Sequence, residues 1–330
     1  MSSTGVSVAL CTYNGGRFIE EQLLSILRQD PCASEIVVSD DGSTDQTLEI
    51  VRRVAAANAG SDTEIRILES HGGHGVTKNF ERAIAACRYD LIALADQDDI
   101  WRADKLEVML EQFDARPDLL FLHSDARLVD GRGKPLGREL FEALEVSSED
   151  RTAIHSGQAF TVFLRRNLAT GATSMIRRAL LEFAVPFPDD WVHDEWLAIV
   201  ASAVSTLDFV PETLIDYRQH GQNQIGVQVP SVAIKVRRVL EPRGSRNELL
   251  QAKFRTLFAR LSAIASTAVI PPNKIAAADE KATFEGFRAQ LPAQRVRRIL
   301  SVFREGRRGS YARYASQGRM DMIRDIFQAS

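Results

Sequence analysis

Three carboxylates stand within four positions, at Asp96, Asp98 and Asp99, directly after the apolar run Leu91–Ala95. The run is too short for a helix of its own and predicts a buried strand of a parallel sheet. Like charges this close repel one another, and burying them unpaired costs several kcal/mol, so we expect a cation among them. Because parallel sheets bind ligands beyond the carboxyl ends of their strands, we interpret Asp96-Gln97-Asp98 as a metal-binding Asp-x-Asp step. A solvated acidic loop is the alternative that this stretch alone leaves open.

A second candidate is Asp194, in the stretch His193-Asp194-Glu195-Trp196, where a loop opens onto a predicted helix. The helix dipole stabilises a carboxylate at the N-terminus in its ionised form, which a general base requires. The alternative is that Asp194 only caps the helix.

A predicted strand ends at Tyr217-Arg218-Gln219-His220. Arg218 could bind a phosphate through its guanidinium, and His220 could supply a nitrogen ligand or a hydrogen bond to the same group. An ordinary polar strand end remains the alternative.

Asp40 and Asp41 follow another predicted strand, 35–39. Gly42 stands where a haloacid-dehalogenase-type phosphatase needs its second acid. An acid at a strand end can instead accept a hydrogen bond from a ribose or base, or it can form an Asx-type turn that caps the next helix. The glycine-rich loop His71–Gly75 has neither the Walker nor the Gly-x-Gly-x-x-Gly spacing, which argues against P-loop and nicotinamide chemistry.

These residues follow strands that alternate with amphipathic helices. The predicted strands are 6–10, 35–39, 64–68, 91–95 and 119–124. The alternation predicts an α/β fold of repeated βαβ units, with a mostly parallel sheet flanked by helices and the polar loops along one edge. The pattern is looser after residue 140: short strands are predicted at 172–176, 206–210 and 213–217, and only helices after Val229.

The composition is that of a globular protein, with 45% hydrophobic and 26% charged residues among 330. Three cysteines without a Cys-x-x-Cys pair favour a reducing compartment. The N-terminus lacks the pattern of a signal peptide, and no apolar window reaches the roughly 18 residues of a spanning helix. We therefore expect a cytoplasmic protein.

The net charge of −3 hides an asymmetry, because residues 231–330 hold 20 Lys and Arg against 8 Asp and Glu. Arginines surround the apolar positions Val296, Ile299, Leu300 and Phe303. A basic amphipathic helix of this kind can lie on an anionic membrane surface, whereas the alternative is a helical bundle with a solvated basic face. Nucleic-acid binding is not expected, since the basic region lacks interleaved aromatics and the acidic remainder would repel phosphates.

Taken together, these stretches resemble the inverting glycosyltransferases of family 2, which have the GT-A fold, and in particular a bacterial branch of rhamnosyltransferases. The resemblance runs in order from about Ser7 to Gly226. The matching stretches are 9–15, 37–45, 75–80, 95–101, 170–173, 193–196 and 217–224.

The resemblance implies a role for individual residues. Asp194 would be the base, Gly171–Thr173 would shape the acceptor side, and Glu195 has no catalytic role. The residues expected to bind the nucleotide-diphosphate sugar are Thr12, Tyr13, Asp40, Asp41, Lys78, Asp96, Arg218 and His220. The residues expected to bind Mg²⁺ or Mn²⁺ are Asp96, Asp98 and His220.

The implied reaction is a metal-assisted single displacement with inversion. The expected donor is dTDP-rhamnose, and the expected acceptor is a hydroxyl of a bacterial surface polysaccharide or lipid-linked glycan. A UDP-hexose or UDP-N-acetylhexosamine transferase is one alternative, and a non-catalytic nucleotide-sugar-binding module is another. The expected domains are a GT-A catalytic domain over 1–228 and a helical, basic C-terminal region over 229–330. The protein would be peripheral to the cytoplasmic membrane face if that region binds lipid.

Overall fold

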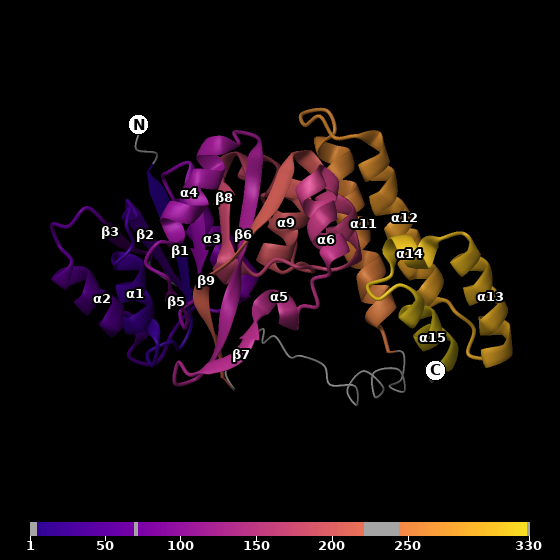
Figure 1. Ribbon diagram of the computed structural model, residues 1–330, viewed down its shortest axis with the longest axis horizontal. Helices are drawn as coiled ribbons and strands as arrows, with labels where there is room; N and C mark the ends of the chain where they lie inside the picture. The colour runs from indigo at the N-terminus through magenta and orange to yellow at the C-terminus, as the bar shows by residue number, and fades with distance from the viewer. Residues whose placement is uncertain (1–4, 69–71, 221–243, 329–330) are drawn as a thin grey trace. The chain divides into compact units, whose positions relative to one another are not determined.

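The structure is a computed structural model that describes residues 5–68, 72–220 and 244–328 (Figure 1). The chain divides into two units. The larger comprises residues 1–157 and 168–227, and the smaller comprises 158–167 and 228–330. The predicted boundary between residues 228 and 229 lies outside the described residues, as do the last four positions of the matching stretch 217–224.

The first half of the larger unit alternates strands with helices, as predicted. Its elements are β1 (Val6–Thr12), α1 (Ile19–Leu27), β2 (Glu35–Asp40), α2 (Thr47–Ala57), β3 (Glu64–Leu68), α3 (Gly75–Ala86) and β4 (Leu91–Ala95). The strands pair in parallel in the order β3-β2-β1-β4. Strands β1, β2 and β4 are buried along their whole length, which explains their continuous apolar sequences. The loops that follow these strands therefore meet at one edge of the sheet.

The second half of the larger unit continues the sheet in the order β4-β8-β6-β9-β5, with β7 paired to β6. Its elements are β5 (Ile100–Trp101), α4 (Lys105–Ala115), β6 (Leu119–Asp130), β7 (Pro135–Glu139), α5 (Leu140–Ala143), α6 (Ser148–Ala153), β8 (Ser174–Arg177), α8 (Leu181–Ala184), α9 (His193–Val204) and β9 (Thr206–Gln219). Strand β8 is antiparallel to both neighbours, and β5 is antiparallel to β9. The sheet is therefore fully parallel in its first half, whereas in its second half β6 and β9 pair in parallel and the other neighbours are antiparallel. Antiparallel neighbours need no crossover helix, so the βαβ repeat stops after α4.

Strand β9 joins the two short strands that the sequence predicts at 206–210 and 213–217. Its pairing with β6 shifts register between Val210 and Thr213, at the position of Pro211. Proline has no N–H for the ladder, so a strand passes it with an irregularity. The continuous strand carries Arg218 to the same edge of the sheet as the loop after β4.

The core of the larger unit lies between the sheet and its helices. Helix α1 buries Ile19, Leu23 and Ile26, and α4 buries Leu106 and Phe113. Each helix therefore buries one apolar face, which confirms the predicted amphipathic helices. The α/β fold class with a helical C-terminal region is likewise confirmed.

The smaller unit is helical throughout its described residues. Its helices are α7 (Ala159–Arg165), α11 (Arg246–Ile264), α12 (Pro272–Ala289), α13 (Arg295–Arg307), α14 (Ser310–Tyr314) and α15 (Arg319–Phe327). Two of its buried cations join α12 to other helices: Arg288 Nε donates to Asp325 Oδ2 on α15 at 2.7 Å, and Lys281 Nζ donates to the carbonyl of Tyr314 on α14 at 2.6 Å. Lys281 Nζ also donates to Glu285 Oε1 within α12 at 2.6 Å. Removing one partner of such a pair would leave a buried charge alone.

Helices α13 and α15 are neighbours (Figure 1). Both expose apolar side chains. We call this the α13–α15 surface, made of Val296, Leu300, Phe303, Met320, Ile323 and Phe327. Seven arginines are also exposed on residues 291–328, whereas none of the three carboxylates in that stretch is. No helix among the described residues combines the length and the hydropathy needed to cross a membrane.

Candidate functional site

The acidic loop after β4 carries negative charge that the protein does not fully balance. Asp98 and Asp99 are buried, at 9% and 1% exposure. Burial, together with the charges of Asp98 and Asp194, raises the pKa of Asp96 to about 7. Burial and the charges of Asp98 and Asp96 raise the pKa of Asp99 as well. A cation placed among these carboxylates would relieve the repulsion.

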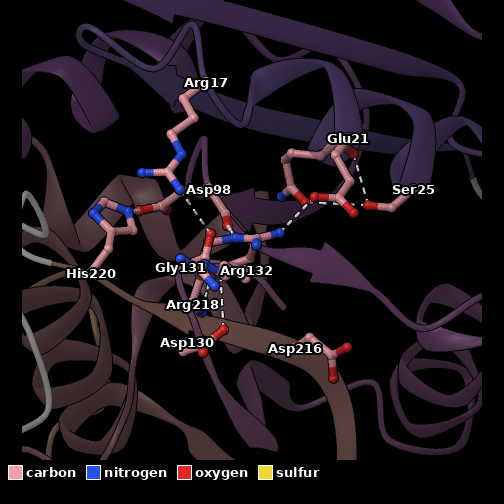
Figure 2. Close-up of polar contacts among 12 residues, drawn as sticks. Arg17, Glu21, Ser25, Asp98, Asp130, Gly131, Arg132, Asp216, Arg218 and His220 are labelled. Carbon is pink, nitrogen blue, oxygen red and sulfur yellow. Dashed lines mark hydrogen bonds and ion pairs between the residues drawn. The ribbon is translucent and has the colours of Figure 1, made fainter. Parts of the chain in front are cut away.

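The end of β9 lies against this loop. His220 Nε2 is 2.7 Å from Asp98 Oδ2 (Figure 2). The backbone N–H of Arg218 donates to Asp99 Oδ1 at 2.9 Å, and its Nε donates to the carbonyl of Asp98 at 2.7 Å. The structure therefore brings together the predicted residues Asp98, Arg218 and His220.

One phenylalanine ring contacts three basic side chains beside the acids. His220 stacks on Phe18 with ring centres 4.8 Å apart. The guanidinium carbons of Arg17 and Arg218 each lie 4.8 Å from the same ring centre. Figure 2 shows Arg17 near His220 and Asp98. Arg17 was missed by the sequence analysis, because an arginine in the turn before a helix has no distinctive spacing.

Asp194 lies in the first turn of helix α9 and accepts hydrogen bonds from backbone groups. The N–H of Gly171 donates to its Oδ2 at 2.9 Å, and the N–H of Glu195 donates to its Oδ1 at 2.6 Å. Its charge is among those that raise the pKa of Asp96. The charge of the candidate base therefore reaches the acidic loop.

Tyr217, near the end of β9, is affected by the same carboxylates. Burial raises the pKa of its hydroxyl, and the charges of Asp99, Asp96, Asp98 and Asp194 raise it further. All four carboxylates therefore act electrostatically on one side chain at the end of β9.

Gly171 lies so close to His193 that no larger residue fits. A Cβ on Gly171 would lie 2.6 Å from His193 Nε2. His193 is buried and stacks on Phe80 with ring centres 3.8 Å apart. Burial lowers the pKa of His193 to about 3, so its ring is neutral. The predicted acceptor-side turn is thus packed directly against the residue before Asp194.

Thr12 and Asp40, which were predicted to bind the sugar donor, are hydrogen-bonded to each other. Thr12 Oγ1 donates to Asp40 Oδ1 at 2.7 Å, and Ser43 Oγ donates to the same oxygen at 2.5 Å. The N–H groups of Gly42 and Ser43 donate to Asp40 Oδ2 at 3.0 and 2.8 Å. Asp40 is also only 1% exposed. These bonds correspond to the Asx-type alternative, so Asp40 would contact a donor only if one of them broke.

Asp41 and Lys78 also have protein partners. Asp41 accepts hydrogen bonds from the N–H groups of His74 and Gly75 at 2.7 and 3.0 Å, where helix α3 begins. Lys78 Nζ donates to Glu81 Oε2 at 3.0 Å and to the carbonyl of Phe187. Asp41 therefore caps α3, and Lys78 ties α3 to the loop before α9. His71 lies outside the described residues.

Tyr13, which was predicted to bind the sugar donor, has an exposed ring. Its side chain is 47% exposed. Gln97 Oε1 accepts from the N–H of Tyr13 at 2.8 Å, and Gln97 Nε2 donates to the carbonyl of Tyr13 at 3.0 Å. The amide of Gln97 thus fixes the loop after β1 against the acidic loop, with the ring at the edge of the sheet.

The candidate metal-ligand atoms at this site have the chemistry that a divalent cation requires. Carboxylate oxygens suit Mg²⁺ and Mn²⁺, and an imidazole nitrogen suits Mn²⁺. Asp99 Oδ2 is buried with no hydrogen-bond partner in the described part of the chain. Across residues 5–68, 72–220 and 244–328, however, no three acidic, histidine or cysteine side chains converge in a ready coordination geometry. A bound cation would therefore require Asp96, Asp98 or His220 to adjust.

Comparisons with known proteins identify the family that this chain resembles. Residues 7–183 match the family model described as glycosyl transferase family 2. The dTDP-rhamnosyl transferase RfbG of Shigella flexneri is 41% identical over 101 residues, which make up 30% of this chain and 34% of that protein. The chain matches three curated glycosyltransferases over 66%, 34% and 56% of their own lengths.

Two solved structures support the GT-A fold. TarS 1–349 of S. aureus, in complex with UDP-GlcNAc, matches with a TM-score of 0.59 and 17% identity, over 98% of this chain and 90% of that one. The mannosyltransferase PcManGT from Pyrobaculum calidifontis, in complex with GDP-Man and Mn²⁺, matches with a TM-score of 0.52 and 18% identity, over 97% and 84%. At such low identities the likeness shows the fold alone.

Proposed function

This chain belongs to glycosyl transferase family 2, and we propose that it moves a sugar from a nucleotide-diphosphate donor to a hydroxyl, with inversion at the anomeric carbon. The observation that carries the proposal is the cluster at the ends of β4 and β9, where His220 Nε2 lies 2.7 Å from Asp98 Oδ2 and Arg218 Nε donates to the carbonyl of Asp98 at 2.7 Å. The charge of Asp194, the candidate base, also raises the pKa of Asp96 in the same loop, which supports a reaction between a donor at the loop and an acceptor activated by Asp194.

Leaving-group stabilisation is the first chemical requirement. Cleavage of the bond between the anomeric carbon and the donor leaves a diphosphate with added negative charge. Mg²⁺ or Mn²⁺ held by Asp96, Asp98 and His220 would neutralise that charge. Arg17 and Arg218 add positive charge at the same place, because both lie against the ring of Phe18.

Activation of the acceptor is the second requirement. Asp194 removes the proton of the acceptor hydroxyl as its oxygen attacks the anomeric carbon from the face opposite the diphosphate. The N–H of Gly171 orients the carboxylate. One base and no enzyme nucleophile give a single displacement, which inverts the anomeric configuration.

Donor recognition involves the loops after β1 and β2. We assign the nucleobase to the exposed ring of Tyr13, which Gln97 fixes beside the acidic loop. Thr12, Asp40 and Asp41 would support that position through the bonds that shape their loops. Lys78 would act indirectly, through the loop before α9.

dTDP-rhamnose is the donor we favour. RfbG, which shares 41% identity over 101 residues, is a dTDP-rhamnosyl transferase. TarS and PcManGT are in complex with UDP-GlcNAc and GDP-Man, so other nucleotide sugars are the competing donors. A thermal-shift panel of nucleotide sugars with Mn²⁺ tests this choice, because a ligand of the native state raises the melting temperature. dTDP-rhamnose should give the largest shift, and a larger shift with a UDP-sugar would replace it.

Transfer distinguishes the enzyme from a binding module. With donor, Mn²⁺ and an acceptor glycan, the protein should release the nucleoside diphosphate with turnover. Donor binding without release would leave only the binding function.

The acceptor proposed is a bacterial surface polysaccharide or lipid-linked glycan, reached from the cytoplasmic face of the membrane. The α13–α15 surface supports this location, since it combines exposed apolar side chains with exposed arginines and lacks exposed carboxylates. Apolar area and positive charge together favour an anionic lipid surface.

A further inference from the structure

Lys105 is a buried cation next to the candidate site, and the sequence analysis assigned it no role. It is 0% exposed. Its Nζ donates a hydrogen bond to the carbonyl of Ala172 at 2.8 Å and lies 3.7 Å from the ring centre of Trp101. Burial lowers the pKa of Lys105 to about 7, while the charges of Asp99 and Asp96 act in the opposite direction.

The position of Lys105 is unfavourable for stability on two counts. Removing an ammonium group from water costs several kcal/mol unless it is well paired. Lys105 is also the first residue of α4, where the helix dipole disfavours a positive charge. A residue that breaks local rules in this way points to a role beyond folding.

The hydrogen bond to Ala172 leads directly to the candidate base. Ala172 belongs to the 3₁₀ turn Gly171–Thr173. The preceding residue, Gly171, donates its N–H to Asp194 Oδ2 at 2.9 Å. Two hydrogen bonds and one peptide unit therefore join Lys105 Nζ to the carboxylate of Asp194.

The other neighbours of Lys105 belong to the donor side. Asp96 and Asp99, on the loop after β4, are the charges that act on its ammonium group. The turn at Gly171–Thr173 lies on the predicted acceptor side. Lys105 thus stands between the acidic loop and the base.

We propose that Lys105 is a positioning residue that holds the Gly171–Thr173 turn, so that the N–H of Gly171 fixes Asp194 at a set place relative to the acidic loop. The inference rests on the proposed function of Asp194 as the base. A displacement of about 1 Å at a reacting group costs up to about 10²-fold in rate, so a lost anchor should lower kcat. Donor affinity should change little, because the hydrogen bond of Lys105 Nζ goes to the acceptor-side turn, and Asp96 acts on Lys105 through its charge.

A double-mutant cycle with Asp194→Asn tests the proposal. Lys105→Met removes the hydrogen-bond donor and the positive charge but keeps a long side chain. We expect Lys105→Met alone to lower kcat about 10- to 100-fold with the KM for the donor within about twofold. In the Asp194→Asn background, Lys105→Met should lower the remaining rate less than about twofold. The side chain that Lys105 positions can no longer accept a proton in that background.

Lys281→Met is the matched control. Lys281 is also a buried lysine, bonded to Glu285, but it belongs to the smaller unit. The Lys281→Met variant should have a lower melting temperature and an unchanged kcat. Loss of kcat in Lys281→Met equal to that in Lys105→Met would show a general effect of removing a buried lysine, and would overturn the proposal.

The cycle separates this inference from the proposed function. Equal losses from Lys105→Met in both backgrounds, or a normal kcat in the wild-type background, overturn the role of Lys105. A normal kcat in Asp194→Asn alone overturns the role of Asp194 instead. Should Lys105→Met fail to fold, Lys105→Leu, which also lacks a hydrogen-bond donor, carries the same cycle, with the same expected loss and the same lack of additivity.

Discussion

Nε2 of His220 lies 2.7 Å from Oδ2 of Asp98, although 122 positions separate the two residues along the chain. Strand β9 makes the contact possible, because its residues Ile215 and Asp216 pair with Trp101 and Ile100 just after the acidic loop. The two residues expected to bind a cation are therefore neighbours through tertiary structure. Their arrangement leads to several measurable consequences.

Asp194→Asn should lower kcat about 10²- to 10⁴-fold while the dissociation constant of the donor stays within about twofold. The amide keeps the size of the side chain but cannot remove a proton. Steady-state kinetics and donor titration measure the two quantities. Glu195→Gln is the matched control, since it neutralises the adjacent carboxylate and should retain activity within about threefold. A near-normal rate for Asp194→Asn would remove this residue from the mechanism.

Asp98→Ala should abolish metal-dependent donor binding. The variant removes a carboxylate that is expected to bind the cation and that contacts His220. The increase in melting temperature caused by donor with Mn²⁺ should disappear, and with it the difference between samples with and without Mn²⁺. Asp216→Ala, on β9 and paired with Arg127, should keep both. A full shift in Asp98→Ala would show that the cation binds elsewhere.

Gly171→Ala should lower both stability and turnover. The added Cβ would lie 2.6 Å from His193 Nε2 and 3.6 Å from the Cβ of Asp194. Overpacking of this kind costs about 1–3 kcal/mol, and displacement of the Gly171 N–H would misplace the base. Denaturant unfolding and kcat are the two measurements. Unchanged values of both would contradict the described packing of this turn.

Stability should fall with acid through His123. This side chain is 1% exposed, and burial lowers its pKa to about 3 from an ordinary 6.5. Its contribution is fully present above about pH 6.5 and is lost as the pH falls toward 3, because the unfolded chain then binds a proton that the native ring does not. His123→Phe should flatten the pH dependence of the unfolding free energy between pH 6 and 4 by about 1.4 kcal/mol per pH unit. An unchanged slope would show that this histidine titrates normally.

The α13–α15 surface should bind anionic vesicles. Wild-type protein should co-sediment with vesicles that contain phosphatidylglycerol and remain in solution with phosphatidylcholine alone. Leu300→Glu combined with Phe303→Glu should abolish co-sedimentation, because both side chains are exposed on α13. Leu249→Glu, at an equally exposed position on α11, should not. Equal binding of both variants would exclude this surface as the contact.

Much of the fold was predictable because the strands that carry the site are buried on both faces. Continuous apolar runs locate β1, β2 and β4 within one or two residues, and parallel pairing then places their loops at one edge. The direction of β8 was not predictable, since a short strand without a crossover helix can pair either way.

The sequence predicts which residues form the site, but it predicts less well which atoms those residues contact. A strand-end acid can bind a ligand or shape its own loop, and only the structure shows that Asp40 accepts four hydrogen bonds from its own and neighbouring loops. Lys105 has the appearance of an exposed lysine at a helix start. Its burial depends on the packing of Trp101 and the turn at Ala172, which lies far along the chain.

The stereochemistry of the transferred sugar tests the account most directly. The measurement is NMR of the anomeric centre of the first product, formed with Mn²⁺ from the donor that most stabilises the protein. A single base at Asp194 predicts a product whose anomeric configuration is opposite to that of the donor. A product that retains the donor configuration would contradict the account.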